Sequence, residues 1–492
     1  MQRIFYILLL IFMFSEASAQ FVMRNNLYNR VAPDSIDLDY YSKKKPLQAV
    51  GEIVALNLGV WSFDRYILKG DFAYISLNTI KDNFKKGFVW DNDKLPTNLF
   101  NHPYNGNLFY NSARSSGFNY WQSGGFALGG SLMWEMFMER EFPSTNDVIA
   151  TPIGGMALGE IFYRTSDLVL DDRARGGDRF GRELAGLVIS PMRGLSRIVS
   201  GDAWRVRPSS GSQFGSPELS VELSAGVRFL ELKDKIFDKG SGFTSSISIE
   251  YGDKFDNESV TPYDYFNIVG NINIHSSQPL IGQINAMGRL WGSDLVDSKK
   301  DYLGLAAFQY FDFYDSDTIS SVSNKKPYEF GTPASFGLAL LYKDRRHQEW
   351  HMDGHAHLSA ILLGATLSDY YALDERNYNW GSGFGWKAGV NISFKDKIGF
   401  SWLHEGYRIF TWEGYPEDLE DLSSVDFRTL NVQGDKSNAI LHATTFRSDI
   451  KIYQHNYFSI LSTLYSRRTN YAYYADIESL TGELRFMYTY KF

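Results

Sequence analysis

The last nine residues of the chain, LRFMYTYKF (484–492), decide its fold class. One parity of this stretch is apolar or aromatic and the other carries the charged and hydroxyl side chains. The first parity contains Leu484, Phe486, Tyr488, Tyr490 and Phe492, and the second contains Arg485, Thr489 and Lys491. A strand is the conformation that places alternate residues on opposite faces. We therefore predict that the chain ends in a β-strand with one apolar and one polar face.

The same alternation recurs upstream in residues 218–232, 263–275 and 386–394. The apolar faces contain Val221, Leu223, Ala225, Val227 and Phe229, then Phe266, Ile268, Ile272 and Ile274, then Trp386, Ala388, Val390, Ile392 and Phe394. A soluble sandwich would also alternate, but these apolar faces are rich in aromatic residues, and we expect no hydrophobic helix to cover them. The pattern predicts a transmembrane antiparallel β-barrel over residues 218–492, and turn signals divide it into about twelve strands.

The connections between these strands provide a test of the barrel. Short connections at 395–397 and 454–456 fall where periplasmic turns are expected, and the longer stretches 315–332, 368–383 and 413–437 fall on the outside. The short stretch at 275–279 is the exception. The terminal strand, which ends on Phe492, resembles the carboxy-terminal signal by which bacterial outer-membrane barrels are recognised, so the barrel assembly machinery is an expected partner during biogenesis.

The amino-terminal end predicts export. Arg3, an apolar run from Ile4 to Phe14, and the small residues Ala17 and Ala19 form a signal peptide over residues 1–19, with a mature start near Gln20. The 492-residue chain contains no cysteine, which excludes disulfides and thiol catalysis. A net charge of −8 argues against nucleic acid as a partner. An aromatic content of 16% fits the girdles of a membrane barrel, so we predict location in the outer membrane.

Residues 46–204 have helical periodicity and follow an N-terminal segment, 20–45. Pro46 begins a helix that carries Val50, Val54 and Leu58, and a second helix covers 71–86. The Ser-, Gly- and Pro-rich stretch 205–217 is a linker to the barrel. The predicted fold class is therefore α+β, with a helical domain followed by a barrel.

Two glycine pairs shape the expectations for this helical domain. Gly125 and Gly129 are four residues apart, as are Gly155 and Gly159, so two helices can approach closely along these faces. A transmembrane hairpin is disfavoured because Pro152 interrupts the second segment, whose uncharged run 148–159 is too short to span a bilayer. We predict a compact domain in the periplasm that either leans on the inner leaflet or plugs the barrel mouth.

Three motifs carry a family resemblance. The runs at 90–114, 134–147 and 151–164 include WDND, FNHPYNGNLFYNSAR, WEMFMEREFPSTND and TPIGGMALGEIFYR. They resemble an uncharacterised family of exported bacterial proteins known as domain of unknown function thirty-nine forty-three. The resemblance covers roughly residues 46–205. The family has no established activity, so the resemblance implies a domain and no chemistry.

The polar stretch at 102–114 is the first candidate site. Pro103 and Gly106 predict a rigid loop for His102, while Tyr110 and Arg114 share a helix face. His102 is the candidate general base, and the candidate ligand-binding residues here are Tyr104, Asn105, Tyr110 and Arg114. The alternative is a hydrogen-bonded clasp that pins the helices together.

Acidic residues form the second candidate. Glu135 and Glu139 lie one turn apart, Asn146 or Asp147 caps the next helix, and Glu160 and Arg164 form an ion pair. With His102 these acids can bind a divalent metal, and with Arg114 and Arg164 they form an internal salt-bridge network. The network is favoured, because no HExxH motif occurs, and no G-x-S-x-G elbow supports a serine hydrolase. No cofactor is evident beyond that weakly supported metal.

The barrel contributes a third candidate in HQEWHMDGHAH (347–357). In a strand, His351, Asp353, His355 and His357 share the face that points to the lumen. Three imidazoles and a carboxylate can hold Zn²⁺. A hydrated polar lumen is the alternative, and it is favoured because the lumen faces of such barrels are polar in any case.

Three functions compete. The favoured one is a structural or binding role, in which the barrel anchors a domain that engages outer-membrane lipid or a protein partner. The second is an enzyme that modifies phospholipid or lipopolysaccharide, with His102 as base, Glu135 or Glu139 as orienting acid or metal ligand, and Arg114 on an anionic group. The third is a channel for small solutes.

Overall fold

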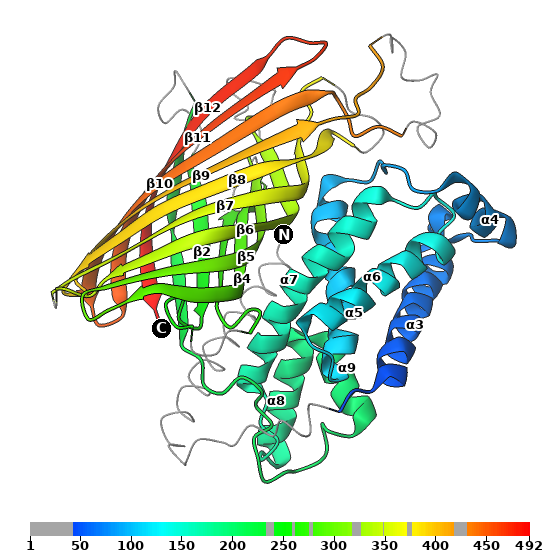
Figure 1. The fold of residues 1–492 in the computed structure, drawn as a ribbon, viewed down its shortest axis with the longest axis horizontal. Coiled ribbons are helices and arrows are strands. Elements are labelled where there is room, and N and C mark those ends of the chain that lie inside the picture. The colour runs from blue at the N-terminus through cyan, green and yellow to red at the C-terminus, as the bar shows by residue number, and fades with distance from the viewer. Residues whose placement is uncertain are drawn as a thin grey trace.

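The computed structural model describes residues 43–232, 241–257, 261–274, 279–316, 326–347, 349–370, 376–417 and 431–492. The predicted signal peptide, the mature start near Gln20 and the exceptional short stretch at 275–278 lie outside the described residues. Helices come first along the chain and strands follow, as the sequence predicts (Figure 1). The helical elements are α3 (Pro46–Phe63), η1 (Asp64–Leu68), η2 (Asp71–Ala73), α4 (Leu77–Lys86), η3 (Thr97–Asn101), α5 (His102–Ser115), α6 (Tyr120–Phe137), α7 (Thr145–Val169), α8 (Gly176–Ile189) and α9 (Pro191–Ser200).

Twelve antiparallel strands close into a barrel in which β1 pairs with both β2 and β12. The strands are β1 (Leu219–Leu232), β2 (Ser241–Tyr251), β3 (Phe266–Ile274), β4 (Ile281–Asp297), β5 (Asp301–Asp315), β6 (Glu329–Asp344), β7 (Trp350–Leu367), β8 (Tyr378–Phe394), β9 (Ile398–Thr411), β10 (Ser437–Tyr453), β11 (Asn456–Tyr471) and β12 (Ile477–Lys491). This confirms the predicted strand number and closure.

The predicted alternation of the last strand is also confirmed. Arg485 and Thr489 are buried in the lumen, and Tyr488 is exposed on the outer surface. Connections 298–300, 395–397 and 454–455 are short and lie at one end of the barrel, which we call the short-turn end. The opposite end, the long-loop end, carries connections such as 412–436. An even strand number, closure and an apolar outer face are the features of an outer-membrane-type barrel.

Local sequence explains where the helices begin. Ser76 and Asn119 form capping boxes at the starts of α4 and α6. The Ser144 hydroxyl caps α7 by accepting a hydrogen bond from the Asp147 backbone nitrogen. The prediction that Asn146 or Asp147 caps this helix was wrong, because both residues lie inside its first turn.

Pro152 does not interrupt its segment, contrary to the prediction. Helix α7 is 25 residues long and continues through Pro152. The proline ring removes one backbone hydrogen bond, and packing on both sides of the helix offsets this loss of stability. Residues 71–86 form the short turn η2 followed by α4 rather than one helix. Within the described residues, none of the helices combines the length and the apolarity needed to cross a membrane.

The glycine prediction holds for one helix and fails for the other. A Cβ on Gly155 would lie 2.3 Å from the Gly106 carbonyl carbon, so α7 contacts α5 almost backbone to backbone. On α6, however, Gly125 and Gly129 face open space. The close contacts of α6 use Gly124 against Met156 and Gly130 against Phe109 instead. A spacing of four identifies a helix face, but it does not identify the face that is covered.

Helix α7 and the turn η3 pack on the outer wall of the barrel, and the other helices pack around α7, so the helical domain lies beside the barrel in Figure 1 rather than in its mouth. Gln309 of β5 faces outward between the lumen-facing Phe308 and Tyr310, and it is fully buried. Its side chain accepts a hydrogen bond from the Tyr120 hydroxyl and donates one to the Ile153 carbonyl over 2.8 Å. Helices therefore cover part of the apolar wall, so the expectation that no hydrophobic helix covers the apolar strand faces was wrong.

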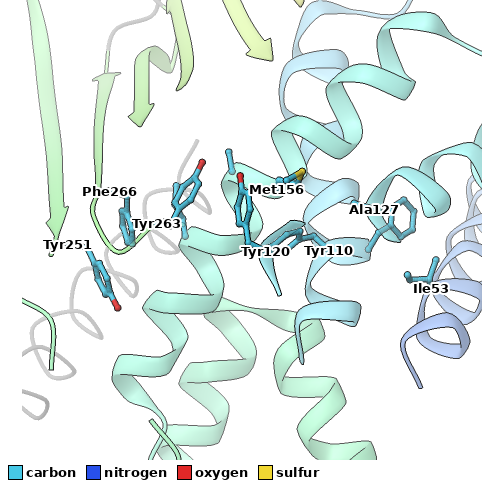
Figure 2. Close-up of a cluster of buried hydrophobic side chains, with 11 residues drawn as sticks. Ile53, Tyr110, Tyr120, Ala127, Met156, Tyr251, Tyr263 and Phe266 are labelled. Atoms are coloured by element: carbon cyan, nitrogen blue, oxygen red, sulfur yellow. The ribbon is translucent and has the colours of Figure 1, made fainter. Parts of the chain in front are cut away.

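A core of aromatic rings joins the two parts near the short-turn end (Figure 2). Tyr120 of α6 stacks on Tyr263 with ring centroids 5.6 Å apart. Tyr251 of β2 stacks on Phe266 of β3 at 4.6 Å. Near the other end, Phe100 of η3 meets Phe313 of β5 edge to face at 5.0 Å. Aromatic side chains bury large areas, so these contacts make one rigid unit of the helices and the barrel.

Candidate functional site

The structure divides the predicted site residues between the two ends of α7. His102, Glu135, Glu139 and Asp147 lie near its amino-terminal end, whereas Glu160 and Arg164 lie on its carboxy-terminal half with Tyr110 and Arg114. The helix is 25 residues long and rises about 1.5 Å per residue, so the two groups do not share a cleft.

The first group is the carboxylate cluster, defined by Asp91, Asp93, His102, Glu135, Glu139 and Asp147. His102 is the first residue of α5, with Pro103 in the first turn, so the predicted loop is a helix start. Glu135 lies in the last turn of α6, but Glu139 lies two residues beyond its end, which corrects the expectation of one shared helix. Asp91 and Asp93 come from the segment before η3, and they were not among the predicted site residues.

Three members of the cluster converge closely. His102 Nε2 lies 3.5 Å from Asp147 Oδ1 and 3.9 Å from Asp93 Oδ2. Asp91 Oδ2 accepts hydrogen bonds from Ser144 Oγ at 3.2 Å and Asn146 Nδ2 at 2.9 Å. One ligand atom from each of Asp91, His102 and Asp147 lies within 4.8 Å of the other two. Among the described residues, this is the one group whose spacing suits a metal ion.

Burial and charge shift the pKa values in the cluster in opposite directions. Burial would lower the pKa of His102, but the carboxylates of Asp147, Asp93 and Asp91 raise it to about 9. Burial raises the pKa of Glu139 to about 8, with a contribution from the charge of Asp93. Burial and the neighbouring carboxylates also raise the pKa values of Glu135 and Asp147 well above their ordinary values. Burial and mutual repulsion therefore favour the protonated, uncharged forms of these three carboxyl groups, because their full ionisation would leave more negative charge than His102 can neutralise.

A small cavity adjoins the cluster. It is lined by His102, Asn105, Ser131 and Glu135, among others, and its volume is about 10 Å³. That volume holds about one water molecule. Tyr104 is exposed on the other side of α5 and does not line this cavity.

The second group is the Glu160 network, formed by Tyr110, Arg114, Glu160 and Arg164. Glu160 is fully buried, and its carboxylate accepts hydrogen bonds from Tyr110 at 2.6 Å, Arg114 at 2.9 and 3.2 Å, and Arg164 at 3.0 Å. Arg164 also donates to Thr261 Oγ1 and the Pro262 carbonyl between β2 and β3. Of the predicted internal salt-bridge network only the part around Glu160 forms, since Glu135 and Glu139 accept from Ser144 and Trp134 instead, and Arg164 also fastens α7 to the barrel.

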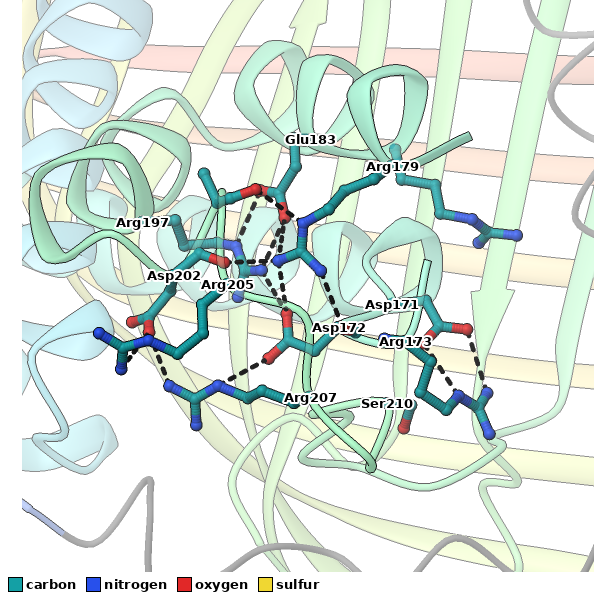
Figure 3. A network of polar contacts seen from close by, with 12 residues as sticks. Asp171, Asp172, Arg173, Arg179, Glu183, Arg197, Asp202, Arg205, Arg207 and Ser210 are labelled. Atoms are coloured by element: carbon teal, nitrogen blue, oxygen red, sulfur yellow. Dashed lines mark hydrogen bonds and ion pairs between the residues drawn. The ribbon is translucent and has the colours of Figure 1, made fainter. Parts of the chain in front are cut away.

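A third network of arginines and acids was missed (Figure 3). Asp172 lies at its centre and pairs with Arg179, Arg197 and Arg207, and Arg197 also pairs with Glu183. Asp202 pairs with Arg207 at 2.7 Å. The charge run DDRARGGDRFGRE at 171–183 and the i,i+4 spacing of Arg179 and Glu183 were the available signals. Charge runs usually lie on a solvated face, which is why this one was overlooked.

The barrel histidines point into the lumen, as the alternation predicts, with His351 exposed at the start of β7. His357 Nδ1 lies 2.8 Å from the Tyr310 hydroxyl. Asp353 Oδ2 accepts hydrogen bonds from Lys254 at 2.8 Å and Asn391 at 3.0 Å. The rings of His355 and His357 are 5.0 Å apart. These hydrogen bonds are those of an ordinary polar lumen. Among the described residues, the barrel histidines and Asp353 do not lie close enough together to form a set of metal ligands.

Comparison with known proteins supports the amino-terminal resemblance. Residues 87–192 match the family described as "Domain of unknown function (DUF3943)", a narrower span than the sequence motifs suggested. This match contains the carboxylate cluster and the Glu160 network. The sequence matches no curated protein.

Several solved outer-membrane structures align with the barrel. The NanC porin is 8% identical, with 56% of this chain and 98% of that chain covered and a TM-score of 0.27. The outer membrane channel DcaP of Acinetobacter baumannii is 7% identical. The alignment covers 56% of this chain and 97% of that chain, with a TM-score of 0.23. The toluene transporter TodX of Pseudomonas putida is 5% identical. The alignment covers 56% of this chain and 89% of that chain, with a TM-score of 0.22. Scores this low carry no argument about solutes or activity.

Proposed function

We propose that this protein is a structural and binding component of the outer membrane, in which the barrel anchors the helical domain and the domain binds envelope components. The observation that carries the proposal is the attachment of the helices to the outer wall. Tyr378 of β8 donates to the Asp93 carbonyl at 2.7 Å near the long-loop end, and Arg164 binds the β2–β3 connection near the short-turn end. The side chains of Tyr378 and Arg164 are both buried, so these contacts tie the domain to the barrel at both ends of the wall.

The short-turn end supports the expected orientation. Short connections face the periplasm in outer-membrane barrels. The linker from α9 enters β1 at this end, where Gly252 donates to the Glu218 carbonyl. We therefore assign the linker to the periplasmic side, and α8 and α9 to the part of the domain nearest to that side.

Within this role, the carboxylate cluster binds a divalent metal ion through Asp91, His102 and Asp147. Imidazole nitrogen and carboxylate oxygen are ligands for Zn²⁺ and similar ions. His102 and Arg376 are the basic groups whose charge acts on Asp91, and four further carboxylates surround them. A bound dication would neutralise charge that burial otherwise makes costly.

Metal binding is tested with Zn²⁺ as the probe. Isothermal titration of the full chain in detergent micelles is expected to show one site, and Asp147→Asn is expected to weaken it by more than about 100-fold, because losses in the second shell already cost about 10- to 100-fold. The control is Asp82→Asn on the exposed face of α4. Equal affinity in Asp147→Asn, or a folded wild type without Zn²⁺ affinity, contradicts the assignment. His102→Gln provides a second ligand variant if Asp147→Asn misfolds.

The lipid-modifying enzyme is supported less well. It requires Arg114 beside His102, but Arg114 binds Glu160 in the other group. The cavity beside His102 has room for a water molecule and not for a lipid headgroup. These two observations favour binding over turnover.

A channel is also disfavoured, because charged and aromatic side chains cross the lumen. Lys387 of β8 contacts Asp312 of β5 at 2.7 Å and Glu405 of β9 at 2.9 Å. Tyr314 of β5 donates to Glu405 at 2.6 Å, although β5 and β9 are four strands apart. We expect planar-bilayer recordings of the full chain to show no stable conductance. Discrete, reproducible steps that Lys387→Ala enlarges and Lys395→Ala, at an exposed turn, leaves unchanged contradict this prediction.

A further inference from the structure

Helices α8 and α9 bury charged groups and expose apolar ones. The side chains of Asp172, Arg193 and Arg197 are each less than 10% exposed and are held in ion pairs. On α8, by contrast, Phe180 is 64% exposed and Val188 is 74% exposed. Soluble domains show the reverse distribution. Apolar side chains outside and charged side chains inside are typical of a surface that faces hydrocarbon. Charged groups near hydrocarbon must form ion pairs within the protein.

The exposed apolar residues form continuous faces rather than scattered spots. Phe180, Leu184 and Val188 are spaced four apart along one face of α8. Leu195, Ile198 and Val199 are exposed on α9, and Leu47, Val50 and Leu58 on α3. An apolar groove of about 670 Å³ runs between α3 and α9, and its lining includes Ala55, Phe63 and Val199. Exposed apolar patches this extensive mark an interaction surface.

The position of this surface on the barrel identifies what covers it. Helix α7 lies on the outer wall, which lipid surrounds in an outer-membrane barrel, and α3, α8 and α9 pack on α5, α6 and α7 on the side away from the strands. The wall itself exposes Leu338 and Leu340 on β6 and Leu358 and Leu362 on β7. The barrel wall and the outer helices of the attached domain therefore both present apolar side chains outward, at the level where lipid surrounds the wall.

Charged residues concentrate at the edges of this region. Lys81, Lys85 and Lys86 lie on α4, which projects beyond the far end of α3 in Figure 1. Arg205 is 62% exposed in the linker at the short-turn end. Basic residues that flank an apolar band are typical of the two membrane interfaces.

We propose that α3, α8 and α9 are embedded in the bilayer beside the barrel. Phospholipid acyl chains contact their exposed faces and occupy the α3–α9 groove. The inference rests on the outer-membrane role proposed above and specifies the envelope component as acyl chains. None of these helices has to cross the bilayer by itself. Other helices of the domain, which is held on the barrel wall, cover their inner faces and pair the charged groups there.

Site-directed spin labelling tests the proposal directly, because the chain has no native cysteine. Val50→Cys on α3 and Val188→Cys on α8 are labelled with nitroxide in the full chain, reconstituted into phosphatidylcholine vesicles. Lys85→Cys on α4 is the polar control. Labels at positions 50 and 188 are expected to collide with oxygen several-fold more than with a water-soluble nickel complex, and the label at position 85 to show the opposite ratio.

A further label at Leu358→Cys on the barrel wall separates the failure modes. If position 358 reports lipid while positions 50 and 188 report water, the embedding of the helices is refuted and the barrel assignment stands. If position 358 also reports water, the outer-membrane role itself fails. Spin–spin broadening at position 188 with low access to both reagents means that a second copy covers the face, which also overturns the proposal.

Discussion

Glu160→Gln is expected to lower the free energy of unfolding by about 3–5 kcal/mol, the cost of removing one partner from a buried ion pair. Glutamine keeps the shape of the side chain but leaves the guanidinium groups of Arg114 and Arg164 without their shared counter-charge. It also removes an acceptor from the Tyr110 hydroxyl. Urea unfolding in detergent micelles, followed by tryptophan fluorescence, measures the change.

The control for this variant is Glu141→Gln. Glu141 pairs with Arg140 at 3.2 Å, but both side chains are about 40% exposed, so the pair contributes at most about 1 kcal/mol. If the two variants lose equal stability, the Glu160 network does not hold the domain together. A Glu160→Gln protein that keeps wild-type stability leads to the same conclusion.

The pH dependence of stability gives an independent reading of the same network. Burial would raise the pKa of Glu160, but Arg114, Arg164 and the hydrogen bonds lower it to about 2, against an ordinary value of 4.5. A group whose folded-state pKa is depressed contributes stability above its unfolded pKa and loses it as pH falls towards the folded value. Wild type should therefore lose stability more steeply than Glu160→Gln between about pH 4.5 and 2. Parallel curves contradict the assignment.

Gly155→Ala is expected to destabilise the domain by at least about 3 kcal/mol, above the usual cost of overpacking. The added Cβ would meet the Gly106 carbonyl carbon at 2.3 Å and its Cα at 2.6 Å. Both atoms belong to backbone, so no side chain can rotate away and α5 must separate from α7. That separation pulls apart the Glu160 network and the carboxylate cluster, which bridge the same two helices.

The matched control lies on α6. Gly125→Ala and Gly129→Ala introduce the same methyl group where no atom lies within 4 Å. Alanine is a better helix former than glycine, so each control is expected to gain about 0.5–1 kcal/mol. Thermal unfolding by circular dichroism at 222 nm compares the three variants. Equal loss in all of them shows that helix propensity, and not the contact of α5 with α7, sets the cost.

Much of the site followed from local patterns. Tyr110 and Arg114 share a face of α5, and Glu160 pairs with Arg164 one turn along α7, as i,i+4 spacing predicts. The sequence could not place His102 apart from Arg114, because both lie on α5 and only the packing of α6 and α7 separates their partners. Asp91 lies in a segment with no regular periodicity, so no sequence pattern placed it in the carboxylate cluster.

The sequence by itself determined the barrel, because strand side chains alternate strictly and the apolar parity of residues such as Phe486 and Tyr488 must face away from the polar lumen. It also determined that helices precede the strands. Only the tertiary structure decided which helix faces are covered. Gly125 and Gly155 look alike in sequence, yet one faces open space and the other contacts backbone. Long-range packing also placed the helices on the outer wall, since burial of Gln309 depends on Tyr120 and Ile153, more than 150 residues away.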